Sequence, residues 1–190
     1  AVSSLRDPVI LALCIIGGLS MAVFVGLYNA IPFRLDAPPF SLGAAEVLVY
    51  LAYPLGIAAP AVFRRVATRR GRGAATLLGL GGLLAATALL IAPSVITIFV
   101  GLGLLTFAFL GTHSILSGWV VERAHDVGRS TARASSAYLL VYYLGSTLSG
   151  AASTQLWQGG GWTAVIMLAA TAGIVASALC LIVRRRSPRR

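Results

Sequence analysis

Charged side chains are scarce in this sequence. Of its 190 residues, only 11% are Asp, Glu, Lys or Arg, whereas 58% are hydrophobic. In a soluble globular domain about a quarter of the residues are charged, so this chain lacks the side chains needed to cover a water-facing surface. The composition therefore excludes an ordinary soluble enzyme or soluble binding module and predicts a membrane protein.

Lysine is absent altogether, and the net charge of +10 comes from arginines that outnumber five acidic residues. In a soluble domain such an excess would indicate a nucleic-acid partner. Here the arginines are clustered between long apolar runs, which is typical of membrane topology signals. We therefore expect the lipid bilayer, and not nucleic acid, as the partner.

Cysteine is nearly absent as well. Cys14 and Cys180 each lie inside an apolar run, and no zinc or iron–sulfur ligand spacing occurs. Buried thiols in separate helices behave as small hydrophobic side chains. We expect neither a metal site nor a cofactor.

Six apolar runs are each long enough to cross a bilayer, for which a helix needs about 20 residues. Strands are not expected, because the runs lack period-2 alternation. The sequence therefore predicts an all-α membrane protein whose residues 1–190 form a single six-helix bundle. Pro54 and Gly56 predict a bend in the second span. The predicted spans are residues 8–32, 44–63, 74–93, 95–121, 135–157 and 162–183.

The arginines alternate between the two sides of these spans. Fourteen of the 15 fall before the first span, after the last, and in the loops that follow the second and fourth spans, and Arg34 alone falls on the other side. The positive-inside rule then places both ends of the segment in the cytoplasm. We expect a multi-pass protein of the bacterial inner membrane.

Polar side chains are distributed unevenly over the spans. The first and second carry several, the third few, and the fourth, fifth and sixth repeat this order with the opposite starting side. This is the pattern of a 3+3 inverted repeat. It predicts that the first, second, fourth and fifth spans line an aqueous cavity, while the third and sixth face lipid.

Candidate functional residues lie on the polar faces of those four spans. His113 is a proton-coupling candidate because an ionisable group inside a membrane helix indicates a functional site. A neutral histidine tied to a neighbouring hydroxyl is its structural alternative. Glu46, near the outer end of the second span, is a second proton-coupling candidate or a solvated interfacial carboxylate. The candidates for the substrate cavity are Tyr28, Asn29, Tyr50, Tyr53, His113, Tyr138 and Tyr142.

Enzyme chemistry finds little support in the sequence. An intramembrane serine protease would need His113 within hydrogen-bond reach of a serine such as Ser146 or Ser149. No glycine-flanked serine motif that would support an oxyanion site is recognised around these residues. His125 lies in a loop, so paired axial haem ligands across helices are not expected either. We expect that the chain is not an enzyme.

Four stretches resemble a known family: LRDPVILALCIIGG with YNAIPFRL, the loop ATRRGRG, THSILSGWV, and SSAYLLVYYLGSTLSG with GGGW. The chain resembles the C-terminal six helices of a major facilitator superfamily transporter, in particular the arabinose-efflux-permease-like (YnfM-type) branch of drug/proton antiporters. Arg69, Gly71 and Arg72 match the basic and glycine positions of the family's cytoplasmic loop motif, whereas Thr68 replaces its acidic residue.

The resemblance implies half of a twelve-helix fold and proton-coupled efflux of small molecules by alternating access. It implies that the best-known coupling carboxylates lie in an N-terminal six-helix half of the same polypeptide, which this segment lacks. Because the sequence starts with Ala1 and not with Met, we expect a fragment of a longer protein. The alternatives are a self-contained six-helix carrier that works as a homodimer and a non-transporting membrane scaffold.

Overall fold

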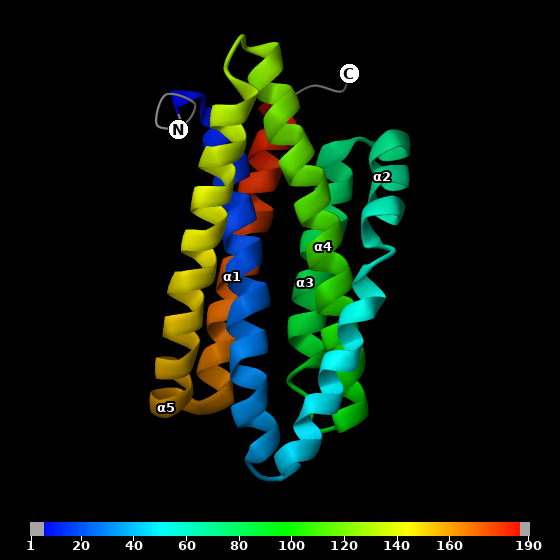
Figure 1. Ribbon diagram of the computed structural model, residues 1–190, viewed down its shortest axis with the longest axis vertical. Helices are drawn as coiled ribbons and strands as arrows, with labels where there is room; N and C mark the ends of the chain where they lie inside the picture. The colour runs from blue at the N-terminus through cyan, green and yellow to red at the C-terminus, as the bar shows by residue number, and fades with distance from the viewer. Residues whose placement is uncertain (1–5, 187–190) are drawn as a thin grey trace.

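The structure is a computed structural model that describes residues 6–186, apart from the side chains of residues 46, 48, 49 and 186. All regular elements in this range are helices, and no strand occurs there. Most of the helices run side by side along the long axis of the molecule (Figure 1). In chain order they are α1 (Pro8–Asp36), η2 (Gly43–Gly56), α2 (Ala59–Arg70), α3 (Arg72–Leu89), α4 (Val95–Asp126) and α5 (Thr131–Arg186).

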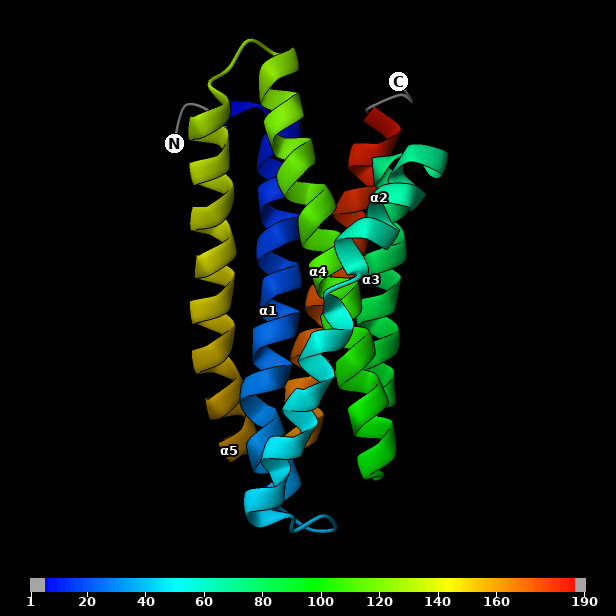
Figure 2. The same cartoon turned by 45° about the vertical axis from the view of Figure 1, so that its right-hand side comes forward.

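The longest element, α5, consists of two antiparallel arms. Its 56 residues contain one non-helical residue, Gly161, with φ 62° and ψ −159°. A backbone with positive φ favours glycine, which has no Cβ to clash with the neighbouring carbonyl. Figures 1 and 2 show the first arm (residues 131–160, yellow) and the second arm (residues 162–186, orange to red) running in opposite directions. The break falls between the fifth and sixth predicted spans.

The second predicted span is bent, as Pro54 and Gly56 indicated. Its first part is the 3-10 helix η2, with Pro54 inside it, and its second part is α2. The two parts meet at an angle of 41°. A proline supplies no backbone N–H to a helix, so the helix bends or changes its hydrogen-bond pattern at that point. The predicted bend is therefore confirmed, and it separates a 3-10 part from an α-helical part.

Length and hydropathy identify four helices in the described range that could cross a membrane, or five if η2 and α2 form one bent span. The observed helices extend beyond several predicted spans. Thus α1 continues through Pro32 to Asp36, and α4 continues to Asp126. Both extensions carry charged residues, which end an apolar run in the sequence without ending the helix. The chain is a helical, multi-pass membrane protein.

Helix α1 lies at the centre of the packing and makes its most extensive contacts with α5. Gly18 of α1 and Gly145 of the first arm of α5 meet backbone to backbone: a Cβ at Gly145 would lie 3.0 Å from the Cα of Gly18 and would collide with its carbonyl oxygen. Small residues at such crossings let membrane helices approach closely. The remaining helices, η2, α2 and α3, pack around α4, and α3 also contacts α5.

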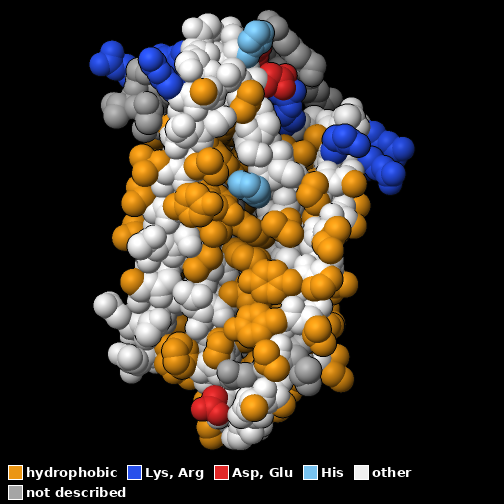
Figure 3. All heavy atoms as spheres, in the orientation of Figure 1, with side chains coloured by type: hydrophobic (Ala, Val, Ile, Leu, Met, Phe, Trp, Pro, Cys, Tyr) orange, Lys and Arg blue, Asp and Glu red, His pale blue; other side chains and the backbone are white. Residues whose placement is uncertain are grey.

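Arginines gather at one end of the bundle, where α1 begins and α5 ends (Figure 3). We call this the basic end. Asp7 caps α1 there, because its Oδ1 accepts the N–H groups of Val9 and Ile10, each at 2.9 Å. The same carboxylate accepts a hydrogen bond from Arg123 Nη2 at 2.9 Å. This pair ties the start of α1 to the end of α4.

The pKa of Asp7 is set by opposing effects. Burial raises the pKa of this carboxyl group. The hydrogen bond from Arg123, the N–H of Ile10, the positive charge of Arg123 and the N–H of Val9 together lower the pKa by more than burial raises it, so the pKa lies below its ordinary value. A second ion pair, between Arg72 and Glu122, joins the start of α3 to the same region of α4. The basic end is therefore held by charge pairs between three helices.

Candidate functional site

A continuous band of aromatic rings runs along one face of the bundle, and we call it the aromatic band. It draws on α1, η2, α4 and the first arm of α5. Figure 3 shows hydrophobic side chains gathered on this face around a histidine. Six of the seven predicted cavity residues belong to it. Its members are Phe24, Tyr28, Tyr50, Tyr53, Phe109, His113, Tyr138 and Tyr142.

The end of the band farther from the basic end consists of three tyrosines. The ring centroid of Tyr28 lies 4.7 Å from that of Tyr53 and 6.0 Å from that of Tyr50. Tyr28 is buried and its Oη lies 2.7 Å from Thr106 Oγ1, which joins α1 to α4. Tyr53, by contrast, is 42% exposed. In this part of the band, the exposed ring of Tyr53 from η2 therefore packs against the buried ring of Tyr28 from α1.

Phe24 and Phe109 form the middle of the band, and neither was among the predicted cavity residues. Their rings are stacked, with centroids 4.2 Å apart and planes within 14°. The helical spacing held the signal, because Phe24 precedes Tyr28 by four residues and Phe109 precedes His113 by four. The prediction considered only polar side chains, so the two phenylalanines were missed.

His113 lies at the other end of the band and is hydrogen-bonded to Tyr138. Its Nδ1 is 3.0 Å from Tyr138 Oη, and its ring centroid is 4.8 Å from that of Tyr142. Tyr138 is buried and packs against Gly17, where a Cβ would come within 2.5 Å of the ring. A close helix crossing thus fixes the partner of the histidine. The structural alternative for His113 was a neutral histidine hydrogen-bonded to a neighbouring hydroxyl, and the hydroxyl of Tyr138 is in that position.

The serines considered as protease nucleophiles lie away from His113. Ser149 is buried next to Gly26 of α1, and its Oγ donates to the carbonyl oxygen of Ser146 at 3.2 Å. A nucleophilic serine needs its base within about 3 Å. The described contact of His113 is with a tyrosine, so the geometry gives no support to the protease alternative.

A recess of about 340 Å³ opens beside His113, between α4 and the first arm of α5. From His113 and Tyr138 it extends along α4 toward the basic end, since Ser117 and Val121 follow His113 on α4 and Ser135 precedes Tyr138 on α5. The hydroxyl groups of Ser117 and Ser135 and the imidazole of His113 can hydrogen-bond water within it. The recess is lined by His113, Ser117, Gly118, Val121, Ser135, Tyr138 and Leu139.

The other predicted residues fall outside the band. Asn29 is exposed and lies on the side of α1 that faces Gly150 of α5, so it does not join the aromatic band, and its place in a substrate cavity stays a prediction. The side chain of Glu46 lies outside the described residues. In the loop motif, Gly71 has φ 85° between α2 and α3, Arg72 pairs with Glu122, and Arg69 is exposed at the end of α2.

Comparison with curated proteins finds transporters. The chain is 31% identical over 166 residues to "Uncharacterized MFS-type transporter YybF" of Bacillus subtilis, covering 87% of this chain and 40% of the relative. It is 34% identical over 150 residues to "Inner membrane transport protein YnfM" of Escherichia coli, covering 78% and 35%. An "Uncharacterized transporter" of Buchnera aphidicola is 30% identical over 84% of the chain and 39% of the relative.

No protein-family model matches the chain. No solved structure matches it either. The chain spans about two fifths of the length of the curated relatives named above. The chain is therefore related to major facilitator superfamily transporters, as its motifs indicated, and it corresponds to a part of them.

Proposed function

We propose that this chain, as a relative of major facilitator superfamily transporters, forms the C-terminal six-helix half of a secondary active transporter. The complete protein exports small molecules in exchange for protons by alternating access. The six spans are α1, the bent pair η2–α2, α3, α4 and the two arms of α5, arranged as a 3+3 inverted repeat. Inverted repeats of this kind hold substrate sites near the midplane of the membrane.

The aromatic band is the observation that carries this proposal. Its rings come from four helices and lie on one face, which suits one wall of a cavity shared with a second half. Ligand sites are typically apolar surfaces with a few polar groups that orient the ligand. The band offers tyrosine hydroxyls and the His113 imidazole on an otherwise apolar surface, so amphipathic molecules with flat rings are suitable substrates.

His113 is the proposed proton site of this half. It combines an ionisable ring with a hydroxyl-lined recess that extends toward the basic end, and a histidine can exchange a proton at physiological pH. Tyr138 and Tyr142 are the titratable side chains packed against it. Glu46 is the second proposed proton-coupling residue. Carboxylates of the N-terminal half would complete the pathway.

The basic end is the proposed cytoplasmic end, because arginine-rich loops remain on the cytoplasmic side of a membrane. Both ends of the segment then lie in the cytoplasm of a bacterial cell, and the transporter lies in the inner membrane. The Arg72–Glu122 and Asp7–Arg123 pairs would hold the cytoplasmic ends of α1, α3 and α4 together.

The cavity assignment can be tested by thiol labelling of the full-length protein in membrane vesicles. Cysteines replace Tyr53, His113 and Tyr142 one at a time, and a charged, membrane-impermeant thiol reagent is added. We expect modification at these positions in at least one transport state. The control is Ile174→Cys on the second arm of α5, where a 59% exposed side chain should face lipid and resist a charged reagent.

Resistance of all three band positions would contradict the cavity assignment, and so would equal labelling of Ile174→Cys. The native Cys14 and Cys180 are buried, which keeps the background from this segment low. The same preparation separates the alternatives. Transport by the 190-residue segment alone would favour the homodimeric carrier, and labelling without transport by the full-length protein would favour a scaffold.

A further inference from the structure

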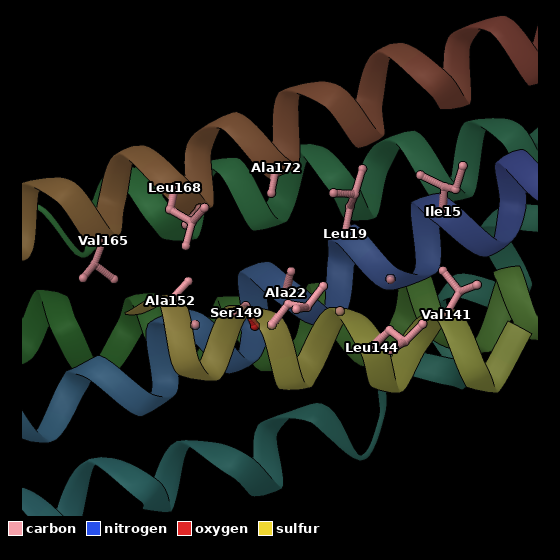
Figure 4. A pocket seen from close by; sticks show the side chains of 15 residues that line it. Ile15, Leu19, Ala22, Val141, Leu144, Ser149, Ala152, Val165, Leu168 and Ala172 are labelled. Carbon is pink, nitrogen blue, oxygen red and sulfur yellow. The ribbon is translucent and has the colours of Figure 1, made fainter. Parts of the chain in front are cut away.

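A second hollow lies on the other side of α1, between α1 and both arms of α5. Its volume is about 350 Å³. Figure 4 shows side chains of α1 and of both arms of α5 pointing into this space, which we call the apolar pocket. Glycine and alanine provide the room: Gly18, Ala22 and Gly26 on α1 face Gly145 and Ala152 on the first arm.

The lining of the apolar pocket has almost no hydrogen-bonding capacity. Ser149 is its one polar side chain, and the Ser149 hydroxyl already donates to the carbonyl oxygen of Ser146. A polar ligand group would lose its hydrogen bonds to water without replacement, which is unfavourable. The occupant must therefore be an apolar chain.

The position of the pocket separates it from the aromatic band. Successive residues of an α-helix turn by 100°, so Ala22 and Gly26 lie on a different side of α1 from Phe24 and Tyr28. On the first arm of α5 the rim carries Leu144, which is 50% exposed, and Leu148, which is 68% exposed. If the second half of the transporter covers the aromatic band, as the proposed function requires, the pocket faces the hydrocarbon of the bilayer.

A positively charged side chain, Arg133, lies on the first arm of α5, which also lines the apolar pocket. Arg133 is exposed and precedes Leu144 by 11 residues. Eleven residues make three turns of helix, so Arg133 lies on the same side of α5 as Leu144 and roughly 16 Å closer to the basic end. An acyl chain in the pocket would extend toward that end, and an anionic phosphate near Arg133 would satisfy the guanidinium.

We propose that the apolar pocket binds one acyl chain of an anionic phospholipid from the leaflet at the basic end, with its phosphate group beside Arg133. The lipid fills the space that the small residues leave between α1 and the arms of α5. The lipid therefore stabilises the arrangement of the helices that carry Gly17 and Tyr138, without contacting the aromatic band.

The test is native mass spectrometry of the full-length protein, delipidated and then exposed to dioleoyl phosphatidylglycerol or dioleoyl phosphatidylcholine. Ala152→Phe fills the pocket, and Ala151→Phe is the matched control, because Ala151 is exposed and does not line it. We expect the wild type and Ala151→Phe to retain one phosphatidylglycerol, and Ala152→Phe to lose it. Ala22→Leu fills the pocket from α1 and should have the same effect.

Arg133→Gln should reduce retention of phosphatidylglycerol to the level of phosphatidylcholine. A wild type that retains neither lipid would overturn the proposal, as would equal retention by Ala152→Phe and Ala151→Phe when both remain folded by thermal denaturation. If retention is unaffected by Arg133→Gln, the headgroup assignment is wrong. This binding measurement requires no transport, so it fails separately from the thiol-labelling and transport tests of the proposed function.

Discussion

Replacing Gly145 by alanine tests the backbone contact between α1 and the first arm of α5. The added Cβ would collide with the carbonyl oxygen of Gly18 and lie 3.0 Å from its Cα. Both atoms belong to the backbone of α1, so no side-chain rotation can relieve the collision. The two helices must separate, and overpacking of this kind costs about 1–3 kcal/mol.

A gain in helix propensity offsets part of that cost. Replacing a mid-helix glycine by alanine stabilises a helix by roughly 0.5–1 kcal/mol, so the net loss for Gly145→Ala should be at most about 2.5 kcal/mol. Gly81→Ala on α3 is the matched control. A Cβ there meets nothing within 4 Å, so only the gain in propensity remains.

The assay is thermal unfolding of the purified full-length protein in detergent, followed by intrinsic tryptophan fluorescence at a fixed heating rate. A fixed rate matters because membrane proteins often unfold irreversibly. We expect a lower midpoint for Gly145→Ala than for the wild type and an equal or higher midpoint for Gly81→Ala. A Gly145→Ala variant as stable as Gly81→Ala would refute the inference that α1 and α5 touch at this point.

The remaining predictions concern the basic end and the proposed proton site. Asp7→Asn keeps a capping side chain but removes the charge, so at neutral pH we expect a loss of about 1–3 kcal/mol through Arg123. Because the pKa of Asp7 is lowered by folding, this contribution is present above the ordinary pKa of 3.8 and fades as pH falls through the folded value. Thermal midpoints of the wild type and Asp7→Asn should therefore converge below about pH 4, and a constant difference would contradict the ion pair. His113→Gln should abolish the dependence of ethidium transport on an imposed pH gradient in proteoliposomes, whereas His125→Gln should not; retained dependence in His113→Gln would remove His113 as the coupling group.

The sequence predicted most of the helices because their cause is local. Long apolar runs form membrane-spanning helices because they are not stable when exposed to water. The arginine positions indicate which ends of the helices lie together. The bend of the second span was also predictable, because Pro54 interrupts backbone hydrogen bonding wherever the helix lies. Helix ends were predicted less well, since hydrogen bonding continues past the last apolar residue, as at Asp36 and Asp126.

The candidate site was predicted in part. The polar faces of the four spans supplied six of the eight members of the aromatic band. Helical spacing could not place Asn29 relative to α5, and it gave no reason to prefer Tyr138 over a serine as the partner of His113. Those contacts depend on how far two helices rotate and approach, which is set by Gly17 and its counterparts at the crossings.

The sequence by itself therefore determined a chain of apolar helices with one basic end and a small set of polar side chains at depth. Only the tertiary structure decided that Phe24 and Phe109 join the tyrosines in one band, and that small residues on α1 and α5 leave an apolar pocket behind it. The reason is physical. Hydropathy and charge act on each segment separately, whereas ring stacking and cavities depend on atoms of different helices meeting at a few ångströms.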